Sequence, residues 1–230
     1  MAPNSRIILT RHAQAEHNVG YDWSIHDAPL TPLGRKQAAS LVHQIPTSLQ
    51  NEVELVVTSP LKRTLQTTKL GWAPTIERLG IKNVLCIPEA QECNNYPCDT
   101  GSSREVLEQD PEFADFDLSR LTPDWTSKQG FYADSRDDAL PKRAHWVRRF
   151  LLERPEKVIV LVAHGDILRQ ITATARGEGN HGWLNAEARE YVFDPDTLDG
   201  DCFLRQEQDI AVAGGYAPTS TEADIVTGNL

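Results

Sequence analysis

Three apolar segments of the chain are each followed within a few residues by histidine or arginine. The segments and their following residues are 7–10 with Arg11 and His12, 53–58 with Arg63, and 158–163 with His164 and Gly165. Neutral imidazole can attack phosphorus, and the planar guanidinium fork binds phosphate oxygens through paired hydrogen bonds. Two histidines and two arginines at one site would therefore suit phosphoryl transfer, which depends mostly on positioning the phosphate and neutralising its charge.

Two carboxylates, Glu89 and Glu92, follow a fourth apolar segment at residues 84–87. A carboxylate from this strand end would join the two histidines and two arginines at one rim of the sheet. An attacking imidazole must be neutral. Neighbouring guanidinium charges should lower the pKa of His12 and keep this side chain neutral near neutral pH.

These residues can meet only if the segments before them are parallel strands of one sheet. The four segments are continuously apolar, which is typical of strands covered on both faces, and a weaker strand signal lies at 191–193. Helical patterns lie between them, so the alternation predicts an α/β fold with a mostly parallel sheet. Such sheets bind ligands at the carboxyl ends of their strands, and we expect the site there.

Helix starts are predicted at four polar residues. They are Thr31 before Pro32, Ser59 before Pro60, Ser102 with Glu105 three residues later, and Asp166 after Gly165. Hydroxyl and carboxylate side chains cap helices by accepting unpaired backbone N–H groups, and proline fits the first helical position. A helix that begins near Ser59 would also offer backbone donors to an anion in the site.

A chain of 230 residues is expected to form one domain, 1–230. Residues from about 92 to 141 are rich in Asp, Pro, Ser and aromatic side chains without sustained periodicity. We expect this segment to be an insertion over the sheet edge that shapes substrate choice. The small and polar residues from about 217 to 230 predict a loose C-terminal tail.

The composition excludes several classes of partner. A net charge of −10 argues against nucleic acid and anionic membrane surfaces, because either polyanion would be repelled. No apolar stretch approaches the roughly 18 residues of a membrane span, and the N-terminus shows no apolar signal region. We expect a cytoplasmic or nuclear protein that acts on a small phosphorylated or acidic substrate. The sequence leaves its oligomeric state open.

No metal or organic cofactor is predicted. The other histidines show no His-x-x-x-His spacing or other paired ligand pattern. The four cysteines are Cys86, Cys93, Cys98 and Cys202. They form no Cys-x-x-Cys pair, and we expect buried thiols rather than disulfides or metal ligands.

Five short motifs run in order from about residue 6 to residue 170. They are Arg-His-Ala at 11–13 continuing to Asn18, Leu-Thr-Pro-Leu-Gly at 30–34, Thr-Ser-Pro-Leu-Lys-Arg-Thr at 58–64, Pro-Cys-Asp-Thr-Gly-Ser at 97–102, and Ala-His-Gly at 163–165. This ordered set resembles the histidine phosphatase superfamily in its phosphoglycerate-mutase-like branch. The resemblance implies a three-layer α/β/α sandwich with a mostly parallel central sheet and a helical or loop insertion.

The resemblance also implies roles for seven residues. His12 would accept the phosphoryl group, Glu92 would protonate the leaving oxygen and then assist water, and His164 would complete the catalytic set. Glu89 lies three positions from Glu92 and is a competing candidate for the acid, whose pKa a partly buried site should raise. The residues implied in substrate binding are Arg11, Asn18, Arg63 and Gly165. The implied activity is metal-independent hydrolysis of a small phosphorylated metabolite through a phosphohistidine on His12.

The chain departs from the family pattern at two positions beside the nucleophile. Ala13 and Gln14 stand where members often carry Gly and Glu. Alanine fits if the backbone φ there is negative. These departures motivate one alternative, a fold recruited for non-phosphoryl acid–base chemistry such as an isomerase or dehydratase reaction. A phosphomutase and a phosphate-sensing protein are further alternatives, but the lysine-rich, tyrosine-containing segment of glycolytic mutases is not evident, which favours hydrolysis.

Overall fold

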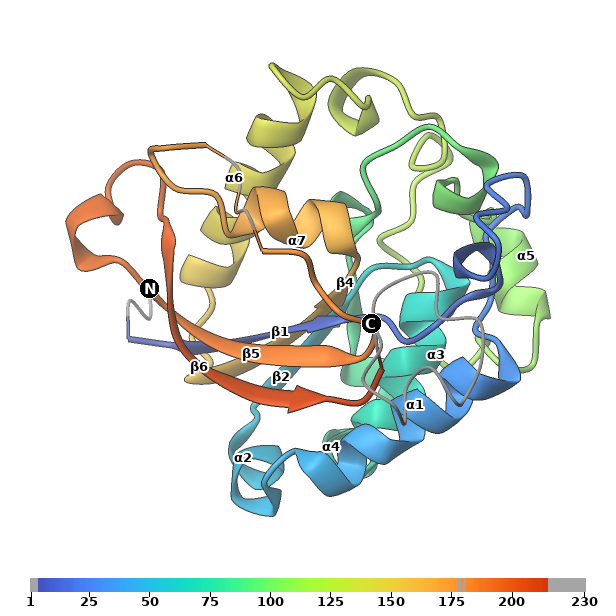
Figure 1. Ribbon diagram of the computed structural model, residues 1–230, viewed down its shortest axis with the longest axis horizontal. Coiled ribbons are helices and arrows are strands. Elements are labelled where there is room, and N and C mark those ends of the chain that lie inside the picture. Colours follow the sequence, from blue (N-terminus) through green and yellow to red (C-terminus); the bar gives the residue numbers. More distant parts are fainter. Residues whose placement is uncertain (1–3, 178, 180, 215–230) are drawn as a thin grey trace.

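The apolar segments of the sequence are the strands of a six-stranded sheet in the computed structural model, which describes residues 4–177, 179 and 181–214. The strands are β1 Arg6–Arg11, β2 Leu55–Thr58, β3 Leu85–Cys86, β4 Val158–Ala163, β5 Glu187–Phe193 and β6 Leu204–Val212. Their order is β3-β2-β4-β1-β5-β6 (Figure 1). The β3–β2, β2–β4 and β4–β1 pairs are parallel, and β5 is antiparallel to both of its neighbours. The predicted mostly parallel sheet is confirmed.

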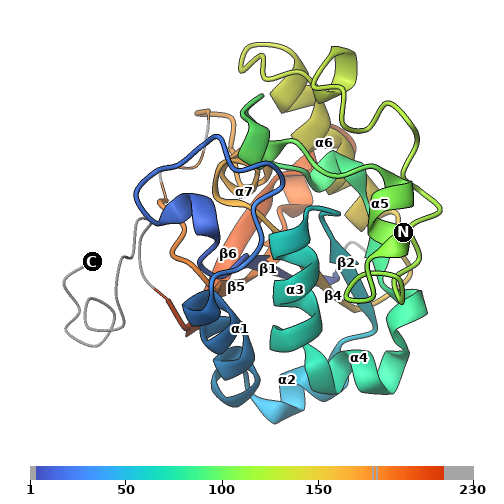
Figure 2. The same ribbon diagram turned by 90° about the vertical axis from the view of Figure 1, so that its right-hand side faces the viewer.

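Helices cover both faces of this sheet, as the fully buried central strands require. The α-helices are α1 Pro32–Gln44, α2 Thr47–Glu52, α3 Lys62–Gly71, α4 Ala73–Leu79, α5 Arg104–Gln109, α6 Ala139–Leu152 and α7 Gly165–Ile171. Ile8 and Val160 pack into one apolar cluster with α1, α3 and α4, whereas Ile7 and Ile159 pack into the other with α6 and α7. Figure 2 shows the sheet between these two helical layers, so the predicted three-layer sandwich is confirmed.

The antiparallel edge of the sheet was only partly predicted. β5 begins at Glu187, four residues before the predicted strand, and β6 was not predicted. Most β6 side chains are exposed, because among the described strands this one pairs only with β5 and lies at the sheet edge. Such a strand lacks the continuous apolar run that marked the central ones.

One of the four predicted helix starts is confirmed. The Thr31 side chain accepts a hydrogen bond from the Gly34 N–H, and Pro32 occupies the first position of α1. The predicted start at Ser102 was wrong by one residue, because Ser103 caps α5.

The starts predicted at Ser59 and Asp166 were also wrong, because distant carboxylates take the capping role. α3 begins at Lys62, whose N–H donates to Asp27 Oδ1 over 3.0 Å. α7 begins at Gly165, so Asp166 lies inside its first turn, and its N–H donates to a carboxylate oxygen of Glu92.

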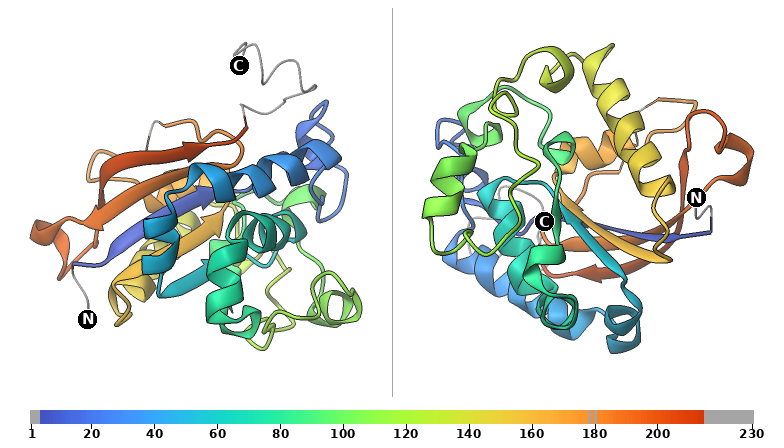
Figure 3. Two further views of the ribbon diagram at one scale, coloured as in Figure 1. Left: turned by 90° about the horizontal axis from the view of Figure 1, so that it is seen from below. Right: turned by 180° about the vertical axis from the view of Figure 1, so that it is seen from behind.

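The segment 92–141 lies at the carboxyl end of the central strands (Figure 3, left). An isolated bridge pairs Asp117 with Leu85, so part of the segment runs beside the edge strand β3. Six of its buried apolar side chains join the cluster of α1 and α3, namely Leu107, Phe113, Phe116, Leu118, Leu121 and Trp125. Its short 3-10 helices are Pro97–Asp99 and Gly130–Tyr132. The segment thus contributes to the core as well as bordering the edge where the predicted site lies.

Other expectations concern the ends and the surface of the chain. The predicted tail at 217–230 lies outside the described residues. Within the described ranges, no helix combines the length and the apolar character needed to cross a membrane. All four cysteines carry free, buried thiols.

Candidate active site

Three of the predicted site residues meet at the carboxyl edge of the sheet. His12 directly follows β1, Arg63 lies in the first turn of α3 after β2, and His164 directly follows β4. The Arg63 Nε–H points between the two imidazoles, 3.3 Å from His12 Nε2 and 3.1 Å from His164 Nδ1. All three side chains are at most 1% exposed. The parallel strands therefore bring together the residues that the strand-end rule predicted.

The contacts of His12 assign its tautomer. Nδ1 lies 2.7 Å from the Ala13 carbonyl oxygen, which can only accept, so Nδ1 carries the proton. Nε2 then holds the lone pair that faces Arg63. Burial, followed by the charges of Arg63 and Arg11, lowers the pKa of His12 well below its ordinary value. The imidazole is therefore neutral and presents Nε2 as a nucleophile.

His164 is also neutral, and both of its ring nitrogens form hydrogen bonds. Its Nδ1 accepts from Arg63, so Nε2 carries the proton and donates to Ser59 Oγ over 2.8 Å. Burial and then the Arg63 charge lower the pKa of His164 well below its ordinary value. The ring centroids of His12 and His164 are 5.2 Å apart. His164 thus fixes the guanidinium against the reactive nitrogen of His12.

Arg63 is further fixed by the segment after β3. Its terminal nitrogens donate to the Cys98 carbonyl oxygen over 2.5 Å and to Asp99 Oδ1 over 2.9 Å. The Arg63–Asp99 pair is buried, with side chains 0% and 5% exposed. Sequence reasoning did not single out Asp99, although it lies inside the motif at 97–102. At the start of α3, where backbone donors to an anion were expected, the first N–H of the helix donates to Asp27 Oδ1.

Arg11 presents hydrogen-bond donors to the same site. One terminal nitrogen donates to the Trp183 carbonyl oxygen, whereas the buried Nε has no partner in the part of the chain that the structure describes. A Cβ placed on Gly165 would lie 3.4 Å from this Nε, so Gly165 packs directly against the guanidinium. A phosphate oxygen would satisfy the unpaired Nε–H, because buried donors are costly to leave unmade.

Asn18 and His17 form a linked pair beside His12. Asn18 Oδ1 accepts from the Ala15 N–H, so its Nδ2 donates to His17 Nε2 over 3.0 Å. The proton of His17 is then on Nδ1, which is buried and has no partner among residues 4–177, 179 and 181–214. Burial and the charges of Arg63 and Arg11 lower the pKa of His17 to about 2. His17 therefore offers a second unpaired donor near His12, and sequence reasoning considered it only as a metal ligand.

Of the two candidate acids, Glu92 lies at the site. Its carboxylate accepts the N–H groups of Cys93, Asp166 and Ile167 over 2.9, 3.2 and 3.0 Å, next to His164. Burial, followed by the charges of Asp166 and Asp99, raises the pKa of Glu92.

Glu89 lies in another environment. It is part of a 3-10 helix, Pro88–Ala90, and the charges that act on it come from Arg120 and Arg143 rather than from the site arginines. Burial also raises the pKa of Glu89, so the shift alone does not separate the two candidates. Their charged neighbours do, because only Glu92 interacts with Arg63.

Lys128 is a further cation at this site that the sequence did not reveal. Its ammonium donates to the Glu92 carbonyl oxygen over 2.9 Å, and its charge acts on His164. Burial and the charge of Arg143 lower the pKa of Lys128 to about 8. Its backbone φ of 53° lies in the left-handed region, which few non-glycine residues occupy. A loop lysine gives no periodic signal, so only the fold identifies it.

The two departures from the family pattern fit the loop after β1. Ala13 is buried and does not have a positive φ, so the expectation that alanine fits is confirmed. The Gln14 side chain accepts from the hydroxyl of Thr31, the residue that caps α1, over 2.7 Å. A Cβ on Gly34 would lie only 1.9 Å from the Gln14 carbonyl oxygen, so only glycine lets α1 approach this loop.

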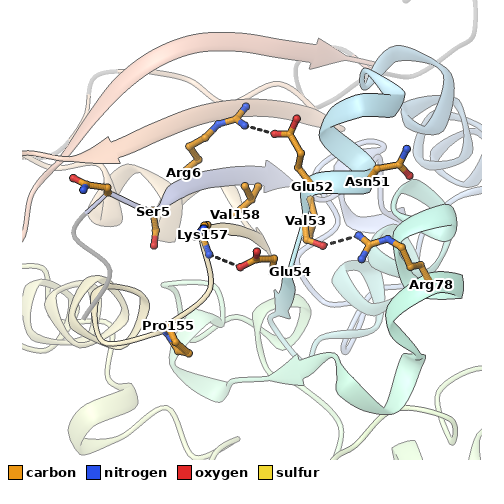
Figure 4. Close-up of a pocket in the computed structure, with 11 residues that line it drawn as sticks. Ser5, Arg6, Asn51, Glu52, Val53, Glu54, Arg78, Pro155, Lys157 and Val158 are labelled. Carbon is orange, nitrogen blue, oxygen red and sulfur yellow. Dashed lines mark hydrogen bonds and ion pairs between the residues drawn. The ribbon is translucent and has the colours of Figure 1, made fainter.

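A cavity of about 880 Å³ lies elsewhere, at the amino ends of β1, β2 and β4 (Figure 4). Its polar groups pair with one another, as Arg6 does with Glu52 over 2.5 Å and Arg78 with the Val53 carbonyl oxygen. No histidine lines it. Across the described ranges, no group of three or more His, Cys, Asp or Glu side chains could hold a metal ion. The side chains suited to phosphoryl transfer therefore meet at the carboxyl edge of the sheet and not in this cavity.

Comparison with known sequences identifies relatives of this chain. The profile of the histidine phosphatase superfamily (branch 1) matches residues 7–192. A protein of Schizosaccharomyces pombe named as a probable phosphatase is 30% identical over 191 residues, covering 82% of this chain and 86% of that protein. Phosphoglycerate mutase-like protein 1 of Arabidopsis thaliana is 32% identical over 197 residues, covering 70% of this chain and 68% of that protein.

Comparison with solved structures supports the same fold. A phosphoserine phosphatase mutant of Entamoeba histolytica, solved with phosphoserine, has a TM-score of 0.56 at 19% identity and covers 90% of this chain and 97% of that one. A mycobacterial glucosyl-3-phosphoglycerate phosphatase has a TM-score of 0.54 at 20% identity and covers 90% of this chain and 99% of that one.

Proposed function

The chain belongs to the histidine phosphatase superfamily, branch 1, and on this premise we propose that it hydrolyses a small phosphorylated metabolite through a phosphohistidine on His12. The observation that carries the proposal is the neutral His12 whose Nε2 lone pair faces the Arg63 guanidinium. That arrangement joins a nucleophile to a positive charge that can hold the phosphoryl group in line.

In the first step His12 Nε2 attacks phosphorus, and the bond between phosphorus and the leaving oxygen breaks. Glu92, whose pKa burial raises, supplies the proton to that oxygen, and the alcohol leaves. The Arg63 contact to Nε2 is long at 3.3 Å, so a phosphoryl oxygen can replace it with a stronger charge-assisted bond. Arg11 Nε–H and His17 Nδ1–H, both without partners in the described part of the chain, supply two further donors.

In the second step water attacks phosphorus on the phosphohistidine, and the Nε2–phosphorus bond breaks. Glu92, now ionised, accepts the proton from water and returns to its starting state. Inorganic phosphate leaves and His12 is regenerated, so the sum is phosphomonoester and water to alcohol and phosphate. No step of this sequence requires a metal or an organic cofactor.

The remaining residues position this set. His164 and Asp99 hold Arg63 from two sides, and Asn18 orients His17. The side chains that would contact the phosphoryl group are at most 9% exposed. Entry of a substrate phosphate therefore requires the side chains that cover the site to shift, as in many phosphoryl-transfer enzymes that exclude water.

The test is phosphate release from a panel of phosphorylated metabolites, in the presence of EDTA, with p-nitrophenyl phosphate as a general probe. The panel includes phosphoserine and glucosyl-3-phosphoglycerate, because two enzymes of similar fold are named for them. His12→Ala should abolish release while remaining folded by circular dichroism. Loss of activity in EDTA that Mg²⁺ or Zn²⁺ restores would contradict the metal-independent mechanism.

Trapping experiments separate the alternatives. Acid-quenched enzyme should carry phosphate on His12 after mixing with a ³²P-labelled substrate. A phosphomutase would also form this intermediate, but it would return the phosphoryl group to an alcohol instead of releasing phosphate. A fold recruited for isomerase or dehydratase chemistry would form no phosphohistidine at all.

A further inference from the structure

Three exposed aromatic side chains form a contiguous group, here called the aromatic lip. Tyr21, Trp23 and Tyr96 are 52%, 45% and 46% exposed. Trp23 stacks on Tyr96 with ring centroids 5.6 Å apart and an interplanar angle of 29°, and Tyr21 lies 5.7 Å from Trp23. Large aromatic rings are usually buried, so a contiguous exposed group of them indicates a binding surface.

The aromatic lip is connected to the nucleophile by ring contacts. The Trp23 ring lies 6.4 Å from the His17 ring, and the His17 ring lies 6.0 Å from the His12 ring. The rings therefore form a row that begins at the buried His12 and ends in solvent. A leaving group attached to a phosphoryl group at His12 Nε2 must point away from the buried core, and this row marks one route outward.

The loops that carry the lip are the loops that hold the phosphate pocket. The Cys98 N–H donates to the Trp23 carbonyl oxygen over 3.2 Å, and the Asp27 N–H donates to the Pro97 carbonyl oxygen over 3.1 Å. Cys98 also accepts from Arg63 through its own carbonyl oxygen. These backbone hydrogen bonds connect the loops that carry the rings to the segment that holds Arg63, and the Trp23–Tyr96 stack joins the two loops at the surface.

We propose that the aromatic lip binds a planar aromatic ring in the leaving group of the substrate, and this inference rests on the proposed phosphatase function. The substrate class is then a phosphomonoester whose alcohol carries an aryl or heteroaryl ring. The ring stacks on the exposed face of the Trp23–Tyr96 pair while the phosphate binds beside His12. Stacking on such preformed aromatic platforms recognises the face of the ring rather than its substituents.

The experiment compares three alkyl phosphates that differ only in the group beyond the leaving oxygen. They are benzyl, cyclohexylmethyl and ethyl phosphate, whose alcohols have similar leaving ability. The wild-type enzyme should prefer benzyl phosphate to cyclohexylmethyl phosphate by about tenfold in kcat/KM, because stacking adds to simple apolar burial. Equal rates for these two substrates would overturn the inference.

Variants test whether the preference comes from the lip. Trp23→Ala should lower kcat/KM for benzyl phosphate by about tenfold and leave ethyl phosphate unchanged, whereas Trp23→Phe should keep most of the preference. Val106→Ala removes another exposed apolar side chain, on α5, and serves as the control that should change neither substrate. A Trp23→Ala enzyme that loses activity equally on all three substrates would show a structural role only and overturn the inference.

Binding separates this inference from the proposed function. Benzylphosphonate and ethylphosphonate cannot be hydrolysed, and calorimetry measures their affinity directly. Tighter binding of benzylphosphonate that Trp23→Ala abolishes, together with no turnover of any phosphate ester, would support the lip and reject the phosphatase. Turnover of the phosphate esters together with equal affinity for the two phosphonates would support the phosphatase and reject the lip.

Discussion

Glu92→Gln should remove the acid of the proposed mechanism while keeping the shape of the site. The mechanism needs His12 neutral and Glu92 protonated at the same pH. The ordinary pKa values, about 6.5 for histidine and about 4.3 for glutamic acid, would give the opposite order and leave almost no enzyme in that state. The structure shifts both groups in the required directions, since it lowers the pKa of His12 and raises that of Glu92.

The magnitude of the loss should depend on the leaving group. General acid catalysis contributes about 10²–10⁴-fold, or about 3–5 kcal/mol of barrier, when the leaving group is an alkoxide that must be protonated. Glu92→Gln should therefore lower kcat/KM by that factor for an alkyl phosphate. p-Nitrophenyl phosphate releases a stable phenolate, so its phosphorylation step should lose far less. The assay is the ratio of the two kcat/KM values in wild type and variant.

The pH dependence of activity is a second test of Glu92→Gln. Activity of the wild type on the alkyl phosphate should fall as pH rises through the raised pKa of Glu92, and this limb should be absent in Glu92→Gln. Folding stability should follow the same sign. The native state holds the Glu92 proton more tightly than the unfolded chain, so the contribution of Glu92 to stability falls as pH rises from about 4.3 towards the raised pKa, and this contribution is the difference between wild type and Glu92→Gln.

Glu89→Gln is the matched control, because Glu89 is also partly buried with a raised pKa but interacts with Arg120 and Arg143. It should leave the substrate ratio and the pH profile unchanged. If the two variants gave the same substrate ratio, or if Glu92→Gln slowed both substrates equally, the assignment of Glu92 as the acid would be refuted. Thermal unfolding of both variants checks that each remains folded.

Three other changes test the residues around the nucleophile. Asp99→Asn leaves Arg63 without its buried carboxylate, so urea unfolding should show a loss of about 3–5 kcal/mol and turnover should fall on every substrate; an unchanged midpoint would contradict the pairing. His17→Phe keeps an aromatic ring but removes the unpaired Nδ1–H and the Nε2 that accepts from Asn18, so kcat/KM should fall about tenfold at every pH, because the pKa of His17 is about 2. A pH-dependent loss would instead indicate a proton-transfer role. Gly34→Ala places a methyl group 1.9 Å from the Gln14 carbonyl oxygen and should cost at least about 1–3 kcal/mol in thermal unfolding, whereas wild-type stability would mean that this loop moves freely.

The sequence alone determined the central sheet and the core of the site. Continuous apolar runs mark the four parallel strands, and the rule that α/β sheets bind ligands at the carboxyl ends of their strands then places His12, Arg63 and His164 together. Both signals are local, because each depends only on a strand and the few residues after it. The order of the five motifs added the family and the three-layer architecture.

Only the tertiary structure decided which distant groups hold those residues in place. Asp27 caps α3 from 35 positions away, and Glu92 caps α7 from a distance of 74 positions. Asp99 holds Arg63 across 36 positions. Local rules look for a cap within the same few residues and therefore chose Ser59 and Asp166 instead. A carboxylate brought by the fold binds the same N–H groups, and nothing in the nearby sequence marks it.

The choice between Glu89 and Glu92 shows the same limit. They lie three positions apart, and burial raises the pKa of each. Which carboxylate interacts with Arg63 depends on how the chain turns after β3 and on where α7 starts. Strand ends are determined by the pattern of the sequence, but electrostatic interactions depend on distances between segments that only the folded chain brings together.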